Sequence, residues 1–312
     1  MSEYLYFFNC SHLERELFEG EFAALFNREN EGNNLLCDIY VPVDNSVYIK
    51  DALKIIYRHP NLECLLSYIK EENVTYDDYK VVYLKDKGSP FDYQRSLELT
   101  RQVGMAIRGC TNMNNPESTI GITFINGEYI VGELSHGQES WKKFLNKPHT
   151  FCNGLDLRMC KTLINLATGN YPGVTVVDPC CGMGAVVLEG LNQGVDIVGF
   201  DISRTNSYKA RLNLEHFGYD GQLIARQAIS DLKIRKDVAI IDLPYNLYTP
   251  ITREEQEEII LSGLKIAPKL ILVAHDDYDE WFKSQGIEIR RKMTVKKFDN
   301  GTFTRLVYIL ER

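Results

Sequence analysis

Two short segments of the chain gather the residue types that could do chemistry. Residues 178–184 (DPCCGMG) follow a β-branched apolar run at 174–177, and residues 242–246 (DLPYN) follow another at 238–241. Such runs are typical of buried parallel strands. Ligands of open α/β sheets bind outside the carboxyl ends of these strands. The first segment therefore predicts a glycine turn for a nucleotide-like cofactor, and the second predicts a rigid clamp for a flat polar group.

The glycine segment has the features of a nucleotide site. Gly182 and Gly184 allow close backbone approach, and the amides of the helix expected after them favour negative groups. Asp201 ends the next expected strand, where a carboxylate would accept hydrogen bonds from ribose hydroxyls, and Ile202 would cover an adenine face. The alternative is an ordinary tight turn in which Asp201 caps the following helix. A dinucleotide fingerprint fits less well, because Val187 stands at the third glycine position.

The second segment suits an exocyclic amine whose lone pair is delocalised into a ring. Asp242 and the carbonyl of Pro244 could each accept an N–H hydrogen bond and draw that nitrogen toward tetrahedral geometry. Pro244 stiffens the turn, and Tyr245 offers an aromatic plane for stacking. The alternative is a strand-end turn with Pro244 and Tyr245 packed as core. A cofactor turn on the same sheet favours the clamp.

Composition limits the partners and the compartment. The 312 residues carry a net charge of −8, with most of the acidic excess in the first half, so a nucleic-acid surface must be local. The eight cysteines show no CxxC pair and no Cys/His zinc spacing, which predicts reduced thiols and no metal site. The N-terminus lacks signal-peptide features, and no apolar run is long enough for a bilayer. We expect a soluble, cytoplasmic protein.

The second half of the chain alternates strands and helices, which predicts a doubly wound parallel α/β sheet. Strands are expected near 174–178, 196–201, 222–226, 238–242 and 269–274. Helices are expected near 155–168, 184–193, 204–217, 253–266 and 278–284. Asp299-Asn300-Gly301 predicts a turn between strands at 288–298 and 302–310, so the sheet would end in an antiparallel hairpin.

The first half is expected to be α+β. Its predicted strands lie at 4–8, 39–41, 47–49, 80–85, 119–125 and 129–134. Its predicted helices lie at 14–26, 51–57, 62–70 and 92–107. Asn126-Gly127 predicts a hairpin turn, because both residues tolerate positive φ.

Basic side chains cluster in two places. The best local patch for RNA phosphates is on the terminal hairpin and comprises Arg290, Arg291, Lys292, Lys296 and Lys297. The alternative is a solvent-exposed edge strand whose charges prevent it from pairing with a strand of another molecule. Along the helix expected at 92–107, a second series could contact RNA or face solvent: Arg95, Arg101 and Arg108.

The glycine segment, Asp201 and the Asp-x-Pro-Tyr clamp together resemble those of class I S-adenosylmethionine-dependent methyltransferases that modify exocyclic amines. The likeness is greatest to the THUMP-containing RNA methylases of the tRNA N2-guanosine position-ten type and their bacterial relatives, and it spans nearly the whole chain. It implies a ferredoxin-like region over 1–50, a THUMP-like RNA-binding module over 51–135, a linker over 136–150 and a methyltransferase domain over 151–312.

The resemblance implies S-adenosylmethionine as cofactor and guanine N2 in tRNA as acceptor. The implied cofactor-binding residues are Asn153, Asp178, Cys180, Gly182, Gly184, Asp201, Ile202 and Gln227. The implied catalytic residues are Asp242, Pro244, Tyr245 and Asn246.

The chain departs from the family pattern at three positions. The usual clamp is Asp-Pro-Pro-Tyr-Gly, whereas this chain has Leu243 and Asn246, and Gln227 replaces an acid after the third strand. Two further hypotheses therefore stay open. One is another acceptor, either an adenine amine or a protein glutamine. The other is an RNA-binding protein that has lost turnover.

Overall fold

The computed structural model describes residues 2–150, 154–245, 250–296 and 304–312. The chain forms two compact units, and each is assembled from separate stretches of sequence. The N-terminal unit comprises Met1–Asn9, Glu31–Asp44 and Tyr48–Gln138. The C-terminal unit comprises Cys10–Asn30, Asn45–Val47 and Glu139–Arg312.

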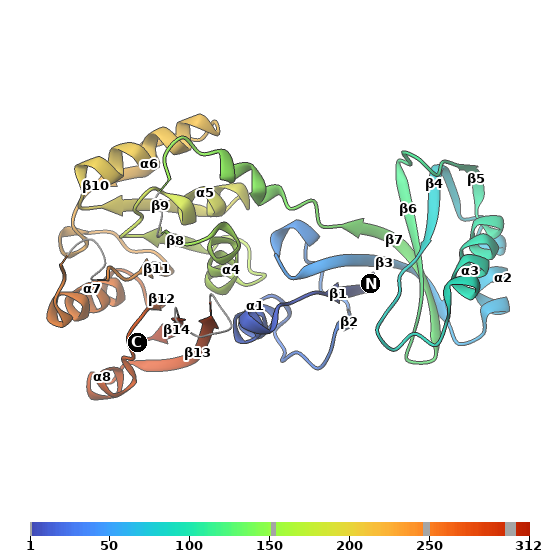
Figure 1. Ribbon diagram of the computed structural model, residues 1–312, viewed down its shortest axis with the longest axis horizontal. Coiled ribbons are helices and arrows are strands. Elements are labelled where there is room, and N and C mark those ends of the chain that lie inside the picture. The colour runs from blue at the N-terminus through green and yellow to red at the C-terminus, as the bar shows by residue number, and fades with distance from the viewer. Residues whose placement is uncertain (1, 151–153, 246–249, 297–303) are drawn as a thin grey trace. The chain divides into compact units, whose positions relative to one another are not determined.

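The C-terminal unit is built on a sheet whose described strands follow the order β10-β9-β8-β11-β12-β14-β13 (Figure 1). Their bounds are β8 Thr175–Asp178, β9 Asp196–Asp201, β10 Ile224–Arg226, β11 Val238–Asp242, β12 Lys269–Ala274, β13 Glu288–Lys296 and β14 Thr304–Glu311. The strands from β10 to β12 are parallel, and β14 is antiparallel to both β12 and β13. This order confirms the expected doubly wound sheet with an antiparallel terminal hairpin. The strand order reverses between β8 and β11, which is where such sheets bind ligands.

Helices cover both faces of this sheet because its buried strands are apolar on both sides. α4 Leu157–Thr168, α5 Ala185–Asn192 and α6 Arg204–His216 share a core with Val176 and Ile240. α7 Arg253–Ile266 and α8 Asp279–Ser284 share a second core with Val177 and Ile241. Successive strand residues thus enter opposite cores, as the period of two in a β-strand requires.

The helix α1, Arg15–Phe26, belongs to the C-terminal unit although it lies near the start of the chain. Leu17 is 1% exposed and joins the core formed with α4. Gly20 faces β13, where an added Cβ would lie 2.2 Å from the sulfur of Met293. This glycine therefore permits the close approach of helix to strand.

The expected linker over 136–150 contains ordered structure. A 3₁₀ helix at Ser140–Asn146 buries Trp141 and Phe144 in the core of the C-terminal unit. Phe144 also meets the ring of Phe217 edge-on, with centroids 4.9 Å apart.

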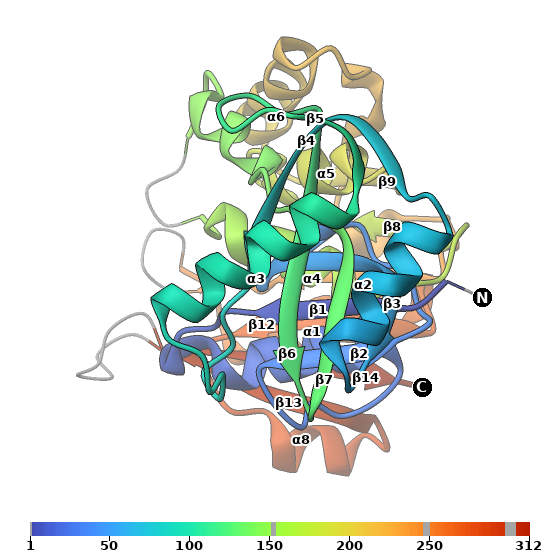
Figure 2. The same cartoon turned by 90° about the vertical axis from the view of Figure 1, so that its right-hand side faces the viewer.

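The N-terminal unit contains a second sheet, with the described order β2-β1-β3-β7-β6-β4-β5. The bounds are β1 Tyr4–Phe8, β2 Asn34–Cys37, β3 Ile49–His59, β4 Thr75–Tyr83, β5 Arg108–Thr111, β6 Ser118–Ile125 and β7 Glu128–His136. α2 Leu62–Glu71 and α3 Tyr93–Ala106 lie on one face of this sheet (Figure 2). β3 pairs with β1 on one side and β7 on the other, so the boundary expected at residue 50 falls inside a strand. The ferredoxin-like and THUMP-like assignments stay predictions.

Most elements expected in this half are present, but the helix at 51–57 and the strand at 39–41 were wrong, and only Ile49 of the strand expected at 47–49 is in a strand. Residues 51–57, expected as a helix, form the middle of β3, because pairing on both edges outweighs local helix propensity. Residues 39–41 are not a strand, because their backbone bonds to the Tyr6 hydroxyl, which accepts from the amide of Val41 at 2.7 Å. The hairpin between β6 and β7 turns at Asn126 and Gly127, with φ of 51° and 83°.

Candidate active site

A cavity of about 250 Å³ lies at the carboxyl ends of β8, β9 and β11. The two segments singled out in the sequence meet there. The predicted site residues that line the cavity are Asp178, Cys180, Gly182, Asp201, Asp242, Pro244 and Tyr245. The cavity therefore lies where the strand order reverses between β8 and β11.

The glycine turn has the backbone geometry that its sequence suggests. Gly182 and Gly184 adopt φ of 52° and 77°, which side chains with a Cβ rarely tolerate. An added Cβ at Gly182 would meet nothing within 4 Å, so this glycine leaves room in the cavity. A Cβ at Gly184 would meet Ala210 and Leu214 of α6 at 3.3 Å. The second glycine therefore serves the packing of α5 against α6.

Asp201 fastens the end of β9 to the glycine turn. Its Oδ2 accepts from the amide of Gly182 at 2.9 Å, and its Oδ1 accepts from the amide of Ser203 at 2.8 Å. The N-cap of α6 is Ser203, whose hydroxyl accepts from the amide of Asn206 at 3.3 Å. Burial raises the pKa of Asp201, while the bonds from Ser203 and Gly182 oppose that rise. Both oxygens of Asp201 already accept a backbone hydrogen bond, so a ligand hydroxyl would have to donate to one of the remaining lone pairs.

Asp242 differs from Asp201, whose two oxygens both accept amide hydrogen bonds. Oδ1 of Asp242 is buried without a hydrogen-bond partner among the described residues. Burial raises the pKa of Asp242 to about 6, and the positive charge of Arg305 opposes the rise. Burial raises the pKa of Asp178 well above its usual range, and the charges of Asp242 and Asp201 raise it further. Three carboxyl groups around one cavity favour a ligand that brings positive charge or N–H donors.

The rest of the clamp is fixed by neighbouring elements. The amide of Leu243 donates to the carbonyl of Val273 on β12 at 2.9 Å. The carbonyl of Pro244 accepts from Nε2 of Gln256 on α7 at 2.8 Å. The ring of Tyr245 lies 4.2 Å from that of His275, at an interplanar angle of 58°.

The curated relatives of this chain include two proteins of the same name. The chain is 23% identical over 235 residues to the tRNA (guanine(10)-N2)-dimethyltransferase of Methanothermobacter thermautotrophicus, covering 70% of this chain and 69% of that protein. It is 24% identical over 246 residues to that of Methanocaldococcus jannaschii, covering 66% and 70%. Among solved structures, TrmN from Thermus thermophilus aligns over 99% of both chains at 17% identity, with a TM-score of 0.49. No protein-family model matches the chain.

Some predicted cofactor residues lie apart from the cavity lining. Ile202 is 69% exposed, and neither it nor Gln227 is among the residues that line the cavity. The side-chain amide of Gln227 donates to the carbonyl of Asp231 at 2.9 Å. Asn153 and Asn246 lie outside the described residues.

The cavity is also lined by residues that were not among the predicted site residues. They include Lys147, Gly154, Leu155, Met183 and Asn206. Asn206 had a usable signal, because it is a polar residue in the first turn of the helix that follows Asp201. Lys147 and Gly154 belong to the segment 147–154, which the family resemblance implies as a wall of the cofactor pocket, and both line the cavity.

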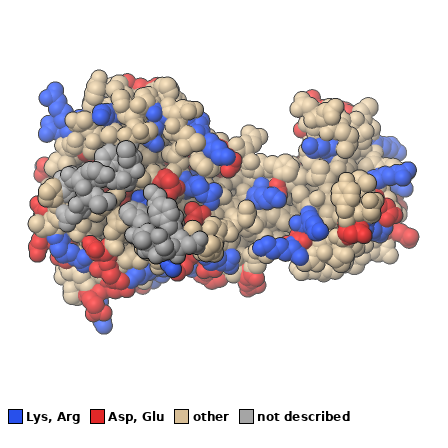
Figure 3. Space-filling view, viewed as in Figure 1, with Lys and Arg blue, Asp and Glu red and all other residues tan. Residues whose placement is uncertain are grey.

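In the basic patch expected on the terminal hairpin, three of the four described residues are paired with acids. Arg290 bonds Glu288 and Glu311, Arg291 bonds Glu29, and Lys292 bonds Asp277 and Asp279. Lys297 lies outside the described residues. Figure 3 shows Lys and Arg interspersed with Asp and Glu on the visible face. These pairings favour the alternative of a charged, solvated edge.

Three observations limit other kinds of site. Within the described ranges, no three His, Cys, Asp or Glu side chains gather as metal ligands. No helix in those ranges has both the length and the apolar character needed to cross a bilayer. The described cysteines Cys10, Cys37, Cys64, Cys110, Cys160, Cys180 and Cys181 are free thiols.

Proposed function

We propose that this protein is an S-adenosylmethionine-dependent methyltransferase that modifies N2 of a guanine in tRNA. The observation that carries the proposal is the Asp242 carboxylate. Asp242 lines the same cavity as Gly182 and Asp201, and its Oδ1 is buried without a partner among the described residues. A buried acceptor without a donor is costly, and a substrate N–H group would satisfy it.

The cavity suits S-adenosylmethionine, which supplies a methyl group on a positively charged sulfur when bound. Gly182 leaves open space next to the amides of the turn, and Asp201 stands at the end of the second strand. The Asp242 carboxylate provides a negative charge for the sulfonium, and the Asp178 side chain lines the same cavity. We assign Asp178, Cys180, Gly182 and Asp201 to this ligand, and we retain Asn153, Gly184, Ile202 and Gln227 as candidates.

The clamp residues act on the acceptor nitrogen. Asp242 and the carbonyl of Pro244 accept its two N–H hydrogen bonds and orient its lone pair toward the methyl group. With a pKa of about 6, Asp242 is ionised at neutral pH and is a suitable acceptor for the proton that the nitrogen loses. Tyr245 offers a face on which a flipped base can stack. Asn246 follows directly and is a candidate for base selection.

The choice of guanine in tRNA rests on the two relatives named tRNA (guanine(10)-N2)-dimethyltransferase. The chemistry of the clamp alone would also suit an adenine amine or a glutamine amide.

The test is methyl transfer from radiolabelled S-adenosylmethionine to unmodified bulk tRNA, with nucleoside mass spectrometry of the product. We expect N2-methylated guanosine with the wild-type protein. Asp242→Asn should lower the rate by about a thousandfold, because the amide keeps the shape and loses the charge. Asp196→Asn is the matched control, since that carboxylate is exposed at the start of β9.

Three outcomes would contradict the proposal in different ways. N6-methyladenosine in the product would identify an adenine amine as the acceptor. Label in protein but not in RNA would point to a protein glutamine. Wild-type protein that fails to bind S-adenosylmethionine in calorimetry would leave an RNA-binding protein without turnover.

We further propose that residues 51–135 serve as the THUMP-like RNA-binding module and that the enzyme acts in the cytoplasm. α3 supports an RNA contact, because Tyr93, Leu97 and Met105 are exposed on the same helix as Arg101. Arg101→Glu should weaken tRNA binding by the full chain several-fold in a mobility-shift assay. Unchanged affinity would remove α3 from the RNA surface.

A further inference from the structure

The backbone of the clamp is held from two directions by groups outside the reacting residues. The amide of Leu243 extends the pairing of β11 with β12, and its side chain is 2% exposed in the core beneath α7. Pro244 has no N–H group, so its carbonyl is the only backbone hydrogen-bonding group through which it can be anchored. That carbonyl accepts from Gln256 at 2.8 Å. A carbonyl oxygen has two lone pairs, so this bond leaves one for the substrate.

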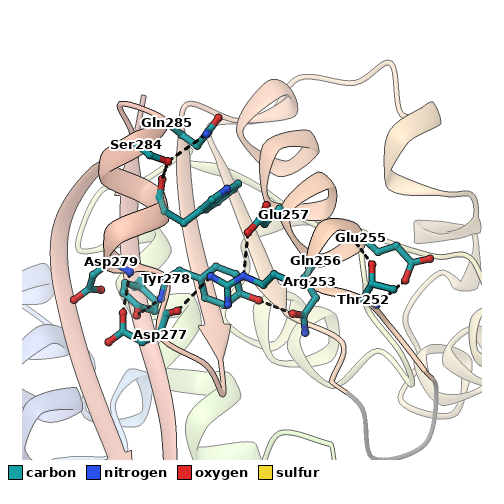
Figure 4. Close-up of polar contacts among 12 residues, drawn as sticks. Thr252, Arg253, Glu255, Gln256, Glu257, Asp277, Tyr278, Asp279, Ser284 and Gln285 are labelled. Carbon is teal, nitrogen blue, oxygen red and sulfur yellow. Dashed lines mark hydrogen bonds and ion pairs between the residues drawn. The ribbon is translucent and has the colours of Figure 1, made fainter.

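Gln256 is a buried polar residue on an otherwise apolar helix face. It is 6% exposed and shares the inner side of α7 with Ile260 and Leu264, four and eight positions later. Its Oε1 accepts from the hydroxyl of Tyr278 at 2.7 Å, as Figure 4 shows. Burial raises the pKa of Tyr278 to about 12, so this hydroxyl keeps its proton and donates. The amide must therefore turn its NH₂ toward Pro244.

Tyr278 is in turn fixed by contacts from α7 and β14. The guanidinium of Arg253 lies 3.3 Å from the centre of its ring, and Arg253 also bonds Glu257 at 3.0 Å and the carbonyl of Asp277 at 3.3 Å (Figure 4). The amide of Tyr278 donates to the hydroxyl of Tyr308 on β14 at 3.3 Å. The orientation of the Gln256 amide is thus set by a rigid, buried framework.

We propose that Gln256 is a positioning residue that holds the Pro244 carbonyl in place to accept a hydrogen bond from the substrate amine, with Tyr278 fixing the direction of the amide. The inference rests on the proposed function, because it assigns the second acceptor of the same clamp. Gln256 itself touches no reacting atom. It acts by preorganising the carbonyl, so its loss affects the step in which the amine is oriented.

Gln256→Glu tests the role of the donated hydrogen bond without changing the side chain's shape. Tyr278 still donates to one oxygen of the carboxylate, so the other oxygen faces the Pro244 carbonyl without a proton. We expect kcat at pH 8 to fall by about tenfold, with KM for tRNA and affinity for S-adenosylmethionine within about twofold of wild type. Tyr278→Phe, which frees the amide to rotate, should lower kcat by about threefold.

The pH dependence separates positioning from a general loss of packing. Once protonated, the carboxyl group that Gln256→Glu introduces can donate to Pro244, so the ratio of variant to wild-type activity should rise as the pH falls from 8 to 6. The charged neighbours Arg253, Glu257 and Asp277 are present in both proteins. Glu258→Gln is the matched control, because it exchanges the same two side-chain types at an exposed position of α7. It should behave as wild type at every pH.

Hydrogen exchange of the cofactor-free protein gives a readout that does not need turnover. The Leu243 amide should exchange faster in both test variants than in wild type and in Glu258→Gln. If the wild-type protein methylated nothing but both variants still exchanged faster than wild type, the anchoring role of Gln256 would stand and the proposed function would fail. Methyl transfer with an unchanged kcat in both variants, or a ratio for Gln256→Glu that is flat with pH, would overturn the positioning role.

Discussion

Asp201 and Asp242 show how one residue type acquires two roles from its surroundings. Both stand at the carboxyl ends of parallel strands beside the same cavity. Asp201 receives amide hydrogen bonds on both oxygens, so it is held as part of the turn. Asp242 has a buried oxygen with no donor among the described residues. Within the described part of the chain this oxygen is unsatisfied, which is the arrangement expected of a group that a substrate completes.

Asp242 should therefore lower stability at the pH where it works. Its folded pKa of about 6 exceeds the ordinary 3.8, so the native state binds more protons between these values, and stability falls as the pH rises through this window. Asp242→Asn removes this penalty and should stabilise the protein at pH 8 by up to about 3 kcal/mol. Urea unfolding at pH 8 and near pH 4 checks this. The gain should shrink at the lower pH, and an equal gain at both would contradict the burial argument.

Gly182 should matter for ligand binding beyond its backbone strain. Gly182 and Gly194 both have positive φ with no atom within 4 Å of an added Cβ, but only Gly182 lines the cavity. Alanine should cost each about 1 kcal/mol of stability. Gly182→Ala alone should also weaken S-adenosylmethionine binding in calorimetry by about tenfold. Equal affinity in the two variants would show that the turn does not contact the cofactor.

The site residues that could be predicted are those whose position follows from a strand end. Asp201 and Asp242 are examples, because a short apolar run and the next polar residue locate them. Gln256 and Arg305 could not be found this way. Gln256 bonds the clamp from a helix, and the charge of Arg305 acts on Asp242 from a reversed strand. The chain reaches both elements later, so both effects depend on tertiary packing. Gln256 did leave a trace, as a polar residue in phase with Ile260 on α7.

The elements of the C-terminal sheet were predictable for a physical reason. Buried parallel strands are short, continuous apolar runs, and turn residues separate them from helices. β3 lacks that simplicity, since its sequence includes the good helix formers Ala52, Leu53 and Lys54. Long-range pairing with β1 and β7 decides its state, and no local window contains those partners.

The docking of α1 on β13 should depend on the missing side chain at Gly20. Gly20→Leu would drive a side chain into Met293 and Leu166, where the first Cβ already lies 2.2 Å from the Met293 sulfur. We expect a loss of about 1–3 kcal/mol in the free energy of unfolding. Gly32→Leu is the control, because an added Cβ there meets nothing within 4 Å. Similar unfolding midpoints for the two variants would mean that α1 docks less closely.

Considered as a whole, the chain does not divide where its sequence suggests. The C-terminal unit takes in residues 10–30 and 45–47 as well as everything after 139. Glu14 bonds Arg158 at 3.0 Å, and the carbonyl of Asn45 accepts from Asn165 at 2.6 Å. These contacts join segments more than a hundred residues apart. Composition and turn signals can suggest a linker, but they cannot show that an early helix returns to a later core.

Residues 139–312 alone should therefore fail as an independent enzyme. Without α1 they would expose the core surface that Leu17 covers, worth about 1.5–3 kcal/mol for one such side chain. The fragment would also lack Glu21, which is buried near Lys161 in the full chain. Lys161 would still form its ion pair with Glu189 at 2.7 Å. We expect the fragment to be aggregated or molten in circular dichroism and calorimetry. Co-expression with residues 1–138 should restore a cooperative transition, because the missing helix is then supplied in trans. A fragment that unfolds cooperatively by itself and binds S-adenosylmethionine like the full chain would show that α1 is an accessory to the core.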